Sequence, residues 1–122
     1  MDKRIMVVDD DPDILIAIRK IFEREGYEVF TVDSGMDCIS EIERGFKGVI
    51  LMDIMMPEMD GYTLTAEVKS RPKLTDLHVI LHTSLSGVFN HAMVEKVGAD
   101  DFIAKFNPDE LAGAVQKWLH AD

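Results

Sequence analysis

The sequence has little cysteine, few basic residues and no long apolar run. Cys38 is the only cysteine, which excludes an internal disulfide and a cysteine-based metal motif. No stretch has the length of a membrane span and no basic-plus-apolar leader opens the chain, so we expect a cytoplasmic protein without a membrane partner. Thirteen Lys and Arg against 23 Asp and Glu give a formal net charge of −10, which argues against nucleic acid as a partner.

What remains is an ordinary globular composition. The 122 residues are 47% apolar and 30% charged, enough chain and enough apolar surface for one core. We therefore expect a single domain over residues 1–122 with no attached effector domain.

Strand-like apolar runs alternate five times with stripes of helical period. Asp11-Pro12 predicts a helix start, Asn107-Pro108 predicts another, and glycines at 26, 45 and 98 predict helix ends. Regular alternation of this kind predicts a doubly wound α/β fold, with a parallel sheet between two layers of helices. The expected strands are 3–8, 27–32, 49–52, 78–83 and 101–104.

Polar side chains follow the ends of four of these strands. Because the carboxyl ends of parallel strands meet at one edge of a sheet, they should lie close together. Three carboxylates there repel one another unless a cation sits among them, and oxygen ligands favour Mg²⁺. The residues are Asp9, Asp10, Asp53, Thr83, Ser84 and Lys105.

A carboxylate beside Mg²⁺, with a hydroxyl and an ammonium group nearby, has the parts for phosphoryl transfer. Simpler explanations remain open. The acids at 9–13 also fit a helix N-terminus, and Asp53 alone fits a strand-end cap. His82 fits a packed strand residue better than a ligand.

Four motifs resemble the signature of the response-regulator receiver domain, the CheY-like family: VVDD at 7–10, LMDIMMPEMDG at 51–61, HTS at 82–84, and the lone Lys105. The resemblance covers the whole chain. It implies a flavodoxin/CheY-like (βα)5 sandwich whose five-stranded parallel sheet has the order 2-1-3-4-5. Residues 62–112 look like the receiver of CheV-type chemotaxis proteins, and the first half looks like a stand-alone receiver, so a recombined or engineered chain is one interpretation.

By this resemblance Asp53 is the phosphoacceptor of a two-component, chemotaxis-type system, and a histidine kinase is the phosphodonor. Mg²⁺ would be held by Asp10, Asp53 and the backbone carbonyl of Met55, with Asp9 helping through a water molecule. The protein would signal rather than act as an enzyme, apart from its own autophosphorylation and autodephosphorylation.

The resemblance also assigns a switch. Thr83, Ser84 and Lys105 would bind the phosphoryl group, and Thr83 with Phe102 would change position on phosphorylation. An output protein would bind the face formed by the fourth helix, the strand at 101–104 and the last helix. The receiver would be a monomer or a phosphorylation-dependent dimer.

Two alternatives stay open. Lys105 is followed by Phe106-Asn107-Pro108 rather than directly by proline, and this altered loop is compatible with a scaffold that binds partners without phosphorylation. An Asp-nucleophile phosphatase of the haloacid-dehalogenase kind shares the chemistry, but Met55 stands where such enzymes have a second acid.

We expect slow self-dephosphorylation. Met55 and Leu85, each two residues beyond a site residue, would flank the path of the attacking water in this family, and neither side chain can orient water.

The double variant Met55→Asn, Leu85→Glu should therefore lose its phosphoryl group faster than the wild type, as followed by decay of the phosphoprotein. An unchanged decay rate would show that both residues only pack the loops.

Overall fold

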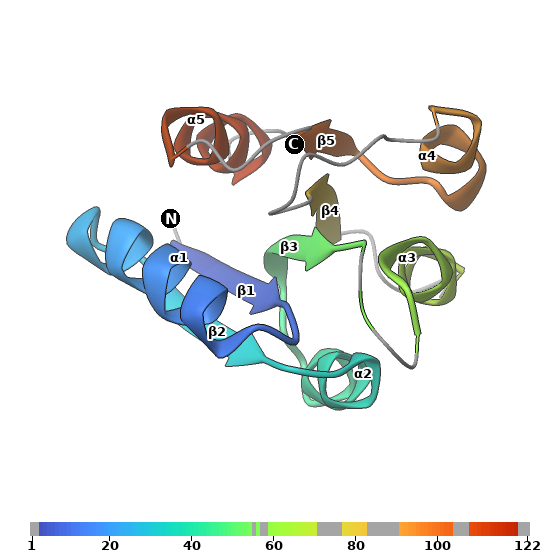
Figure 1. Cartoon of the computed structure of the whole chain (residues 1–122), viewed down its shortest axis with the longest axis horizontal. Helices are drawn as coiled ribbons and strands as arrows, with labels where there is room; N and C mark the ends of the chain where they lie inside the picture. Colours follow the sequence, from blue (N-terminus) through green and yellow to red (C-terminus); the bar gives the residue numbers. More distant parts are fainter. Residues whose placement is uncertain are drawn as a thin grey trace.

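The computed structural model describes residues 3–54, 56, 59–70, 77–82, 91–103 and 108–119. Within these residues five strands alternate with five helices (Figure 1). The strands pair in parallel in the order β2-β1-β3-β4-β5, which confirms the predicted doubly wound α/β fold and its strand order. The elements are β1 Arg4–Val8, α1 Pro12–Arg24, β2 Glu28–Val32, α2 Gly35–Glu43, β3 Gly48–Asp53, α3 Gly61–Lys69, β4 Leu77–His82, α4 His91–Val97, β5 Asp101–Ile103 and α5 Pro108–Leu119.

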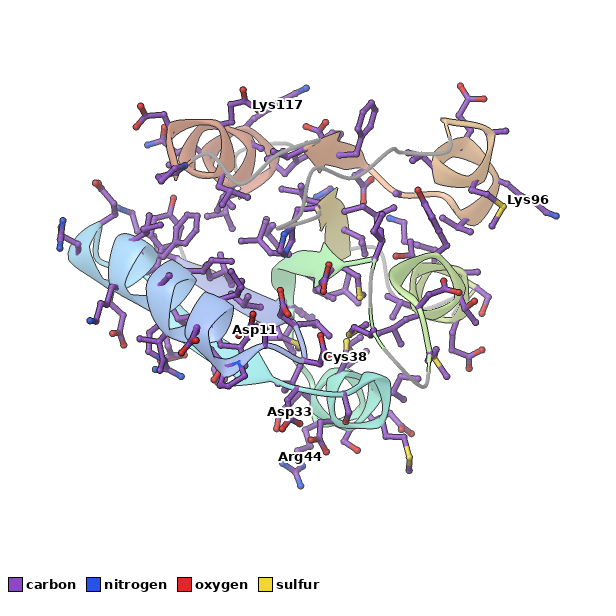
Figure 2. The ribbon with its side chains drawn as sticks, in the orientation of Figure 1. Asp11, Asp33, Cys38, Arg44, Lys96 and Lys117 are labelled. Atoms are coloured by element: carbon purple, nitrogen blue, oxygen red, sulfur yellow. The ribbon has the colours of Figure 1, made fainter. Side chains whose placement is uncertain are left out.

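Two apolar layers enclose the sheet. Side chains of a strand alternate between its faces, so successive residues of β1, β3 and β4 enter different layers. Helices α1 and α5 cover one face, and α2, α3 and α4 cover the other (Figure 1). Cys38 on α2 lies inside the second layer (Figure 2), where burial raises the pKa of its thiol to about 12 and keeps it protonated. None of the described helices is long and apolar enough to cross a membrane.

Helices α1 and α5 begin at the prolines that the sequence predicts, and side chains cap the starts of α1, α2 and α3. Asp11 accepts a hydrogen bond from the backbone N–H of Asp13 at 2.9 Å, with Pro12 at the first helical position. Ser34 caps α2 in the same way at 3.1 Å, and Asp60 caps α3 at 2.8 Å. Each cap follows the loop that leaves the carboxyl end of a strand, so these helix starts share one edge of the sheet.

The strand boundaries differ slightly from the prediction. β3 continues through Asp53, which is therefore part of the sheet rather than the residue after it. β4 runs from Leu77 to His82, so the predicted last residue, Thr83, lies outside the described part of the chain.

Gly61, the first residue of α3, packs directly against the chain that leaves β3. A Cβ atom placed there would overlap the carbonyl oxygen of Asp53 and lie 2.7 Å from Ile54 Cα. Both atoms are backbone, so relief requires moving the end of β3 or the start of α3.

Gly61→Ala should therefore lower the free energy of unfolding by about 1–3 kcal/mol, the usual cost of overpacking. The matched control is Gly113→Ala in α5, where a Cβ atom meets nothing within 4 Å. That change should raise stability by about 0.5–1 kcal/mol, because alanine favours a helix interior. Urea unfolding of both variants measures the difference, and equal effects would contradict the close packing at Gly61.

Candidate functional site

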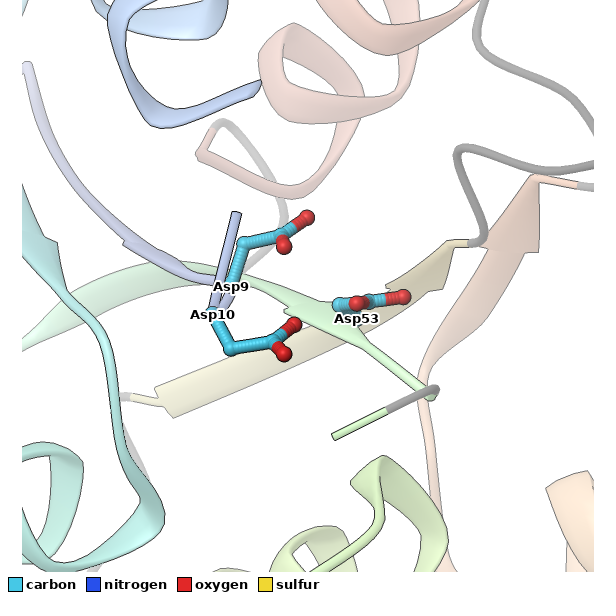
Figure 3. Close-up of side chains that lie close together, drawn as sticks. All are labelled: Asp9, Asp10 and Asp53. Atoms are coloured by element: carbon cyan, nitrogen blue, oxygen red, sulfur yellow. The ribbon is translucent and has the colours of Figure 1, made fainter. Parts of the chain in front are cut away.

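Three carboxylates meet at the carboxyl edge of the sheet (Figure 3). Asp9 and Asp10 follow β1, and Asp53 ends β3. Val8 pairs with Met52 in the parallel register, which places Asp9 beside Asp53. One oxygen from each of the three side chains lies within 4.8 Å of the others. The structure thus brings together the three acids that the sequence selected.

The three acids differ in burial. Asp9 and Asp53 are only 1% and 3% exposed, whereas Asp10 is exposed to solvent. The backbone N–H of Asp11 donates to Asp9 Oδ1 at 2.9 Å, but the buried Asp9 Oδ2 has no hydrogen-bond partner among the described residues. This oxygen is the least satisfied polar atom of the cluster, although the resemblance gave Asp9 only a role through water.

The electrostatics of Asp9 reflect this crowding. Burial raises the pKa of its carboxyl to about 7, the hydrogen bond from Asp11 opposes the shift, and repulsion from Asp53, Asp10 and Asp11 adds to it. A cation among the carboxylates would favour the charged form. Oxygen donors, an unpartnered oxygen and mutual repulsion together fit a hard divalent ion such as Mg²⁺.

The backbone after Asp53 is held on two sides. The N–H of Ile54 donates to the carbonyl oxygen of His82 at 3.2 Å, which ties the end of β3 to the end of β4. The N–H of Gly61 donates to the carbonyl oxygen of Ile54 at 3.2 Å, which ties it to the start of α3. These bonds position Asp53 through its neighbours on both β4 and α3.

Several predicted site residues lie outside the described part of the chain: Met55, Thr83, Ser84, Leu85 and Lys105. Phe102 is described. It is half-buried on β5, pairs in register with Leu81, and packs against the apolar layer under α2, α3 and α4. Its position on the sheet is thus known, and its role as a switch stays a prediction.

His82 has a feature that sequence reasoning missed. The residue is packed, as expected, but it is fully buried, and neither ring nitrogen has a hydrogen-bond partner in the part of the chain that the structure describes. Burial lowers the pKa of its imidazole to about 4, so the ring is neutral at physiological pH. The signal in the sequence was a polar residue at the end of an otherwise apolar strand, but only the register shows that His82 pairs with Asp53.

Comparisons with known proteins agree on one family. The model of the response regulator receiver domain matches residues 5–116. Protein PilG of Pseudomonas aeruginosa is 32% identical over 114 residues, which cover 93% of this chain and 84% of PilG. Response regulator SaeR of Staphylococcus aureus is 38% identical over 116 residues and 94% of this chain, but the match covers only 50% of SaeR, so the chain spans about half of that relative.

A solved structure adds a metal-bound relative. Response regulator TrrA from Thermotoga maritima, crystallised in complex with Mg²⁺-BeF, has a TM-score of 0.81 to this chain at 32% identity. The match covers 96% of this chain and 99% of TrrA. The resemblance of residues 62–112 to CheV-type receivers, and the interpretation as a recombined chain, stay predictions.

In the absence of a cation, Asp9 should lower stability as the pH rises. Its pKa is raised from the ordinary 3.8 to about 7, so between these values the folded protein keeps a proton that the unfolded chain has lost. The free energy of unfolding therefore falls from about pH 4 to about pH 7. Asp9→Asn removes this titration and should gain stability over the wild type across that window, by at most about 4 kcal/mol.

Urea unfolding in EDTA at a series of pH values measures this gain, with Asp37→Asn, an exposed acid on α2, as the control. Excess Mg²⁺ should stabilise the wild type more than Asp9→Asn, because a ligand that binds only the folded state stabilises it. A difference between wild type and Asp9→Asn that does not change with pH would contradict the assignment.

Proposed function

The chain belongs to the family of response regulator receiver domains, and from that premise we propose that Asp53 accepts a phosphoryl group from a histidine kinase with the help of Mg²⁺. One observation carries the proposal: Asp9, Asp10 and Asp53 offer oxygens within 4.8 Å of one another at the carboxyl edge of the sheet. Receiver domains are signalling domains, and TrrA, a relative at 32% identity, was solved with Mg²⁺-BeF.

The position of Asp53 supports its proposed role as the acceptor. It ends the central strand β3, and its carboxylate lies between Asp9 on one side and the end of β4 on the other. A carboxylate oxygen of Asp53 forms the new P–O bond as the P–N bond of the donor phosphohistidine breaks, and the nitrogen electron pair returns to the kinase.

Asp9 and Asp10 would hold the cation together with Asp53 and, by the family resemblance, the backbone carbonyl of Met55. The buried, unpartnered Oδ2 of Asp9 supports a direct role for this residue beside the water-mediated one. When bound, Mg²⁺ takes up part of the negative charge of the phosphoryl oxygens. Thr83, Ser84 and Lys105 would supply two hydroxyls and an ammonium group to the same oxygens.

The position of β5 supports the proposed route from the phosphorylated site to an output protein. Thr83 moves toward the phosphoryl group, Phe102 changes its packing, and an output protein binds the face formed by α4, β5 and α5. Phe102 supports this pathway because it is half-buried on β5 and packs against the apolar layer under α2, α3 and α4. Chemotaxis is the setting we propose, from the likeness of residues 62–112 to CheV-type receivers.

A phosphotransfer panel tests the proposal. Radiolabelled histidine kinases, including chemotaxis kinases, are mixed with the wild type, with Asp53→Asn and with Asp37→Asn, in Mg²⁺ or EDTA. Label should pass to the wild type and to Asp37→Asn in Mg²⁺ only, and Asp53→Asn should stay unlabelled because it lacks the nucleophilic carboxylate.

The same proteins are then titrated with beryllofluoride while Trp118, the only tryptophan, reports by fluorescence. If no kinase labels the wild type, and acetyl phosphate and beryllofluoride leave its mass and its fluorescence unchanged, the protein is a scaffold that works without phosphorylation.

A further inference from the structure

Three buried polar residues form one row across the sheet. Only four polar or charged residues are buried in the described part of the chain: Asp9, Asp53, His82 and the helical Thr65. The first three lie on adjacent strands. Asp53 pairs with His82 in the register of β3 and β4, and Asp9 follows the pair Val8–Met52.

All three residues of the row share a face. Val7, Leu51 and Ile80 belong to the apolar layer under α1 and α5. Asp9, Asp53 and His82 each come two residues later, and residues two apart on a strand point to the same side. The backbone N–H of Asp9 continues this ladder by donating to the carbonyl oxygen of Val32 at 3.2 Å.

The imidazole of His82 is an unusual member of such a row. The residue is 0% exposed, and within the described part of the chain Nδ1 and Nε2 both lack a hydrogen-bond partner. A neutral ring carries one N–H donor and one acceptor nitrogen. Buried groups of this kind are nearly always paired, so an unpaired one calls for an explanation. A leucine at this position would fill the same apolar layer without burying an unpaired polar group.

The two neighbours of Asp53 are therefore chemically different. On the β1 side stand the acids that suit a cation. On the β4 side stands a neutral ring, and facing side chains of paired strands lie about 5 Å apart, within the reach of an imidazole. A phosphoryl group on Asp53 adds negatively charged oxygens, which are strong hydrogen-bond acceptors.

We propose that His82 is a phosphoryl-binding residue, whose ring N–H is unused in the resting protein and donates to a phosphoryl oxygen once Asp53 is phosphorylated. The inference rests on the proposed function of Asp53. It concerns only a hydrogen bond, so the ring neither accepts the phosphoryl group nor binds the cation. The ring N–H that is unpaired in the resting state is then a donor positioned for the anion, and the second ring nitrogen, an acceptor, takes no part.

Beryllofluoride, a phosphoryl mimic, is the probe, and three proteins are compared: the wild type, His82→Leu and His82→Gln. Leucine keeps the apolar volume and removes the donor, whereas glutamine keeps an N–H donor. In Mg²⁺, His82→Leu should bind beryllofluoride about tenfold more weakly than the wild type, the effect of losing one hydrogen bond to a charged group. His82→Gln should recover most of this loss, and the affinity for Mg²⁺ alone should change less than about twofold in both variants.

A second measurement uses the wild type, so its result does not depend on whether a variant folds. Nitrogen-15 spectra of the imidazole rings should show one ring N–H of His82 shifting and becoming protected from exchange when beryllofluoride is added to the Mg²⁺ form. His82→Gln assigns the signal by its disappearance.

Unchanged His82 ring signals on addition of beryllofluoride, or equal beryllofluoride affinities in the wild type and a folded His82→Leu, would show that His82 only packs the core. In both cases the wild type still binds the probe, so the role of Asp53 stands. A wild type that binds no beryllofluoride and accepts no label overturns the proposed function and this inference together.

Discussion

The parallel register of β1, β3 and β4 is the constraint on which the rest of the structure depends. It aligns Val8 with Met52 and Asp53 with His82, and so brings polar residues from three separate motifs into one row at the edge of the sheet. The row disfavours the charged form of Asp9 in the folded protein: burial and mutual repulsion raise the pKa of its carboxyl to about 7. In the absence of a cation, these carboxylates thus repel one another at the carboxyl edge of the sheet.

At the opposite end of the sheet, a partly buried acid has its hydrogen-bond partners within the protein. Asp100 Oδ2 accepts hydrogen bonds from the N–H of Val79 at 2.7 Å and from Lys69 Nζ at 2.9 Å. The lysine comes from the last turn of α3, so this pair also joins α3 to the start of β5. Asp9 Oδ2, by contrast, has no hydrogen-bond partner among residues 3–54, 56, 59–70, 77–82, 91–103 and 108–119. The difference between the two ends supports a site that awaits an external ligand.

Much of this arrangement could be predicted from sequence, and the reasons are physical. Helical period, aspartate and serine caps and the ends of apolar runs are local signals, so the helices, the strands and the convergence of Asp9, Asp10 and Asp53 followed from them. The strand order came from family resemblance. Burial of individual polar groups did not follow, because it depends on register and on packing from distant elements. Trp118 is an example: it is half-buried, and its indole N–H donates to Asp101 Oδ2 at 2.9 Å.

Phe102, the proposed switch, lies close to the row of buried polar residues but on the other face of the sheet. His82 pairs with Ile103 on β5, and the preceding pair is Leu81 with Phe102. Phe102 therefore points to the layer of α2, α3 and α4, while its neighbour Asp101 is bonded to Trp118 on α5. A shift of β5 along β4 would alter the packing of Phe102 under α4 and the hydrogen bond to α5 at once, because both residues belong to one three-residue strand. A face built from α4, β5 and α5 can respond as a unit for this reason.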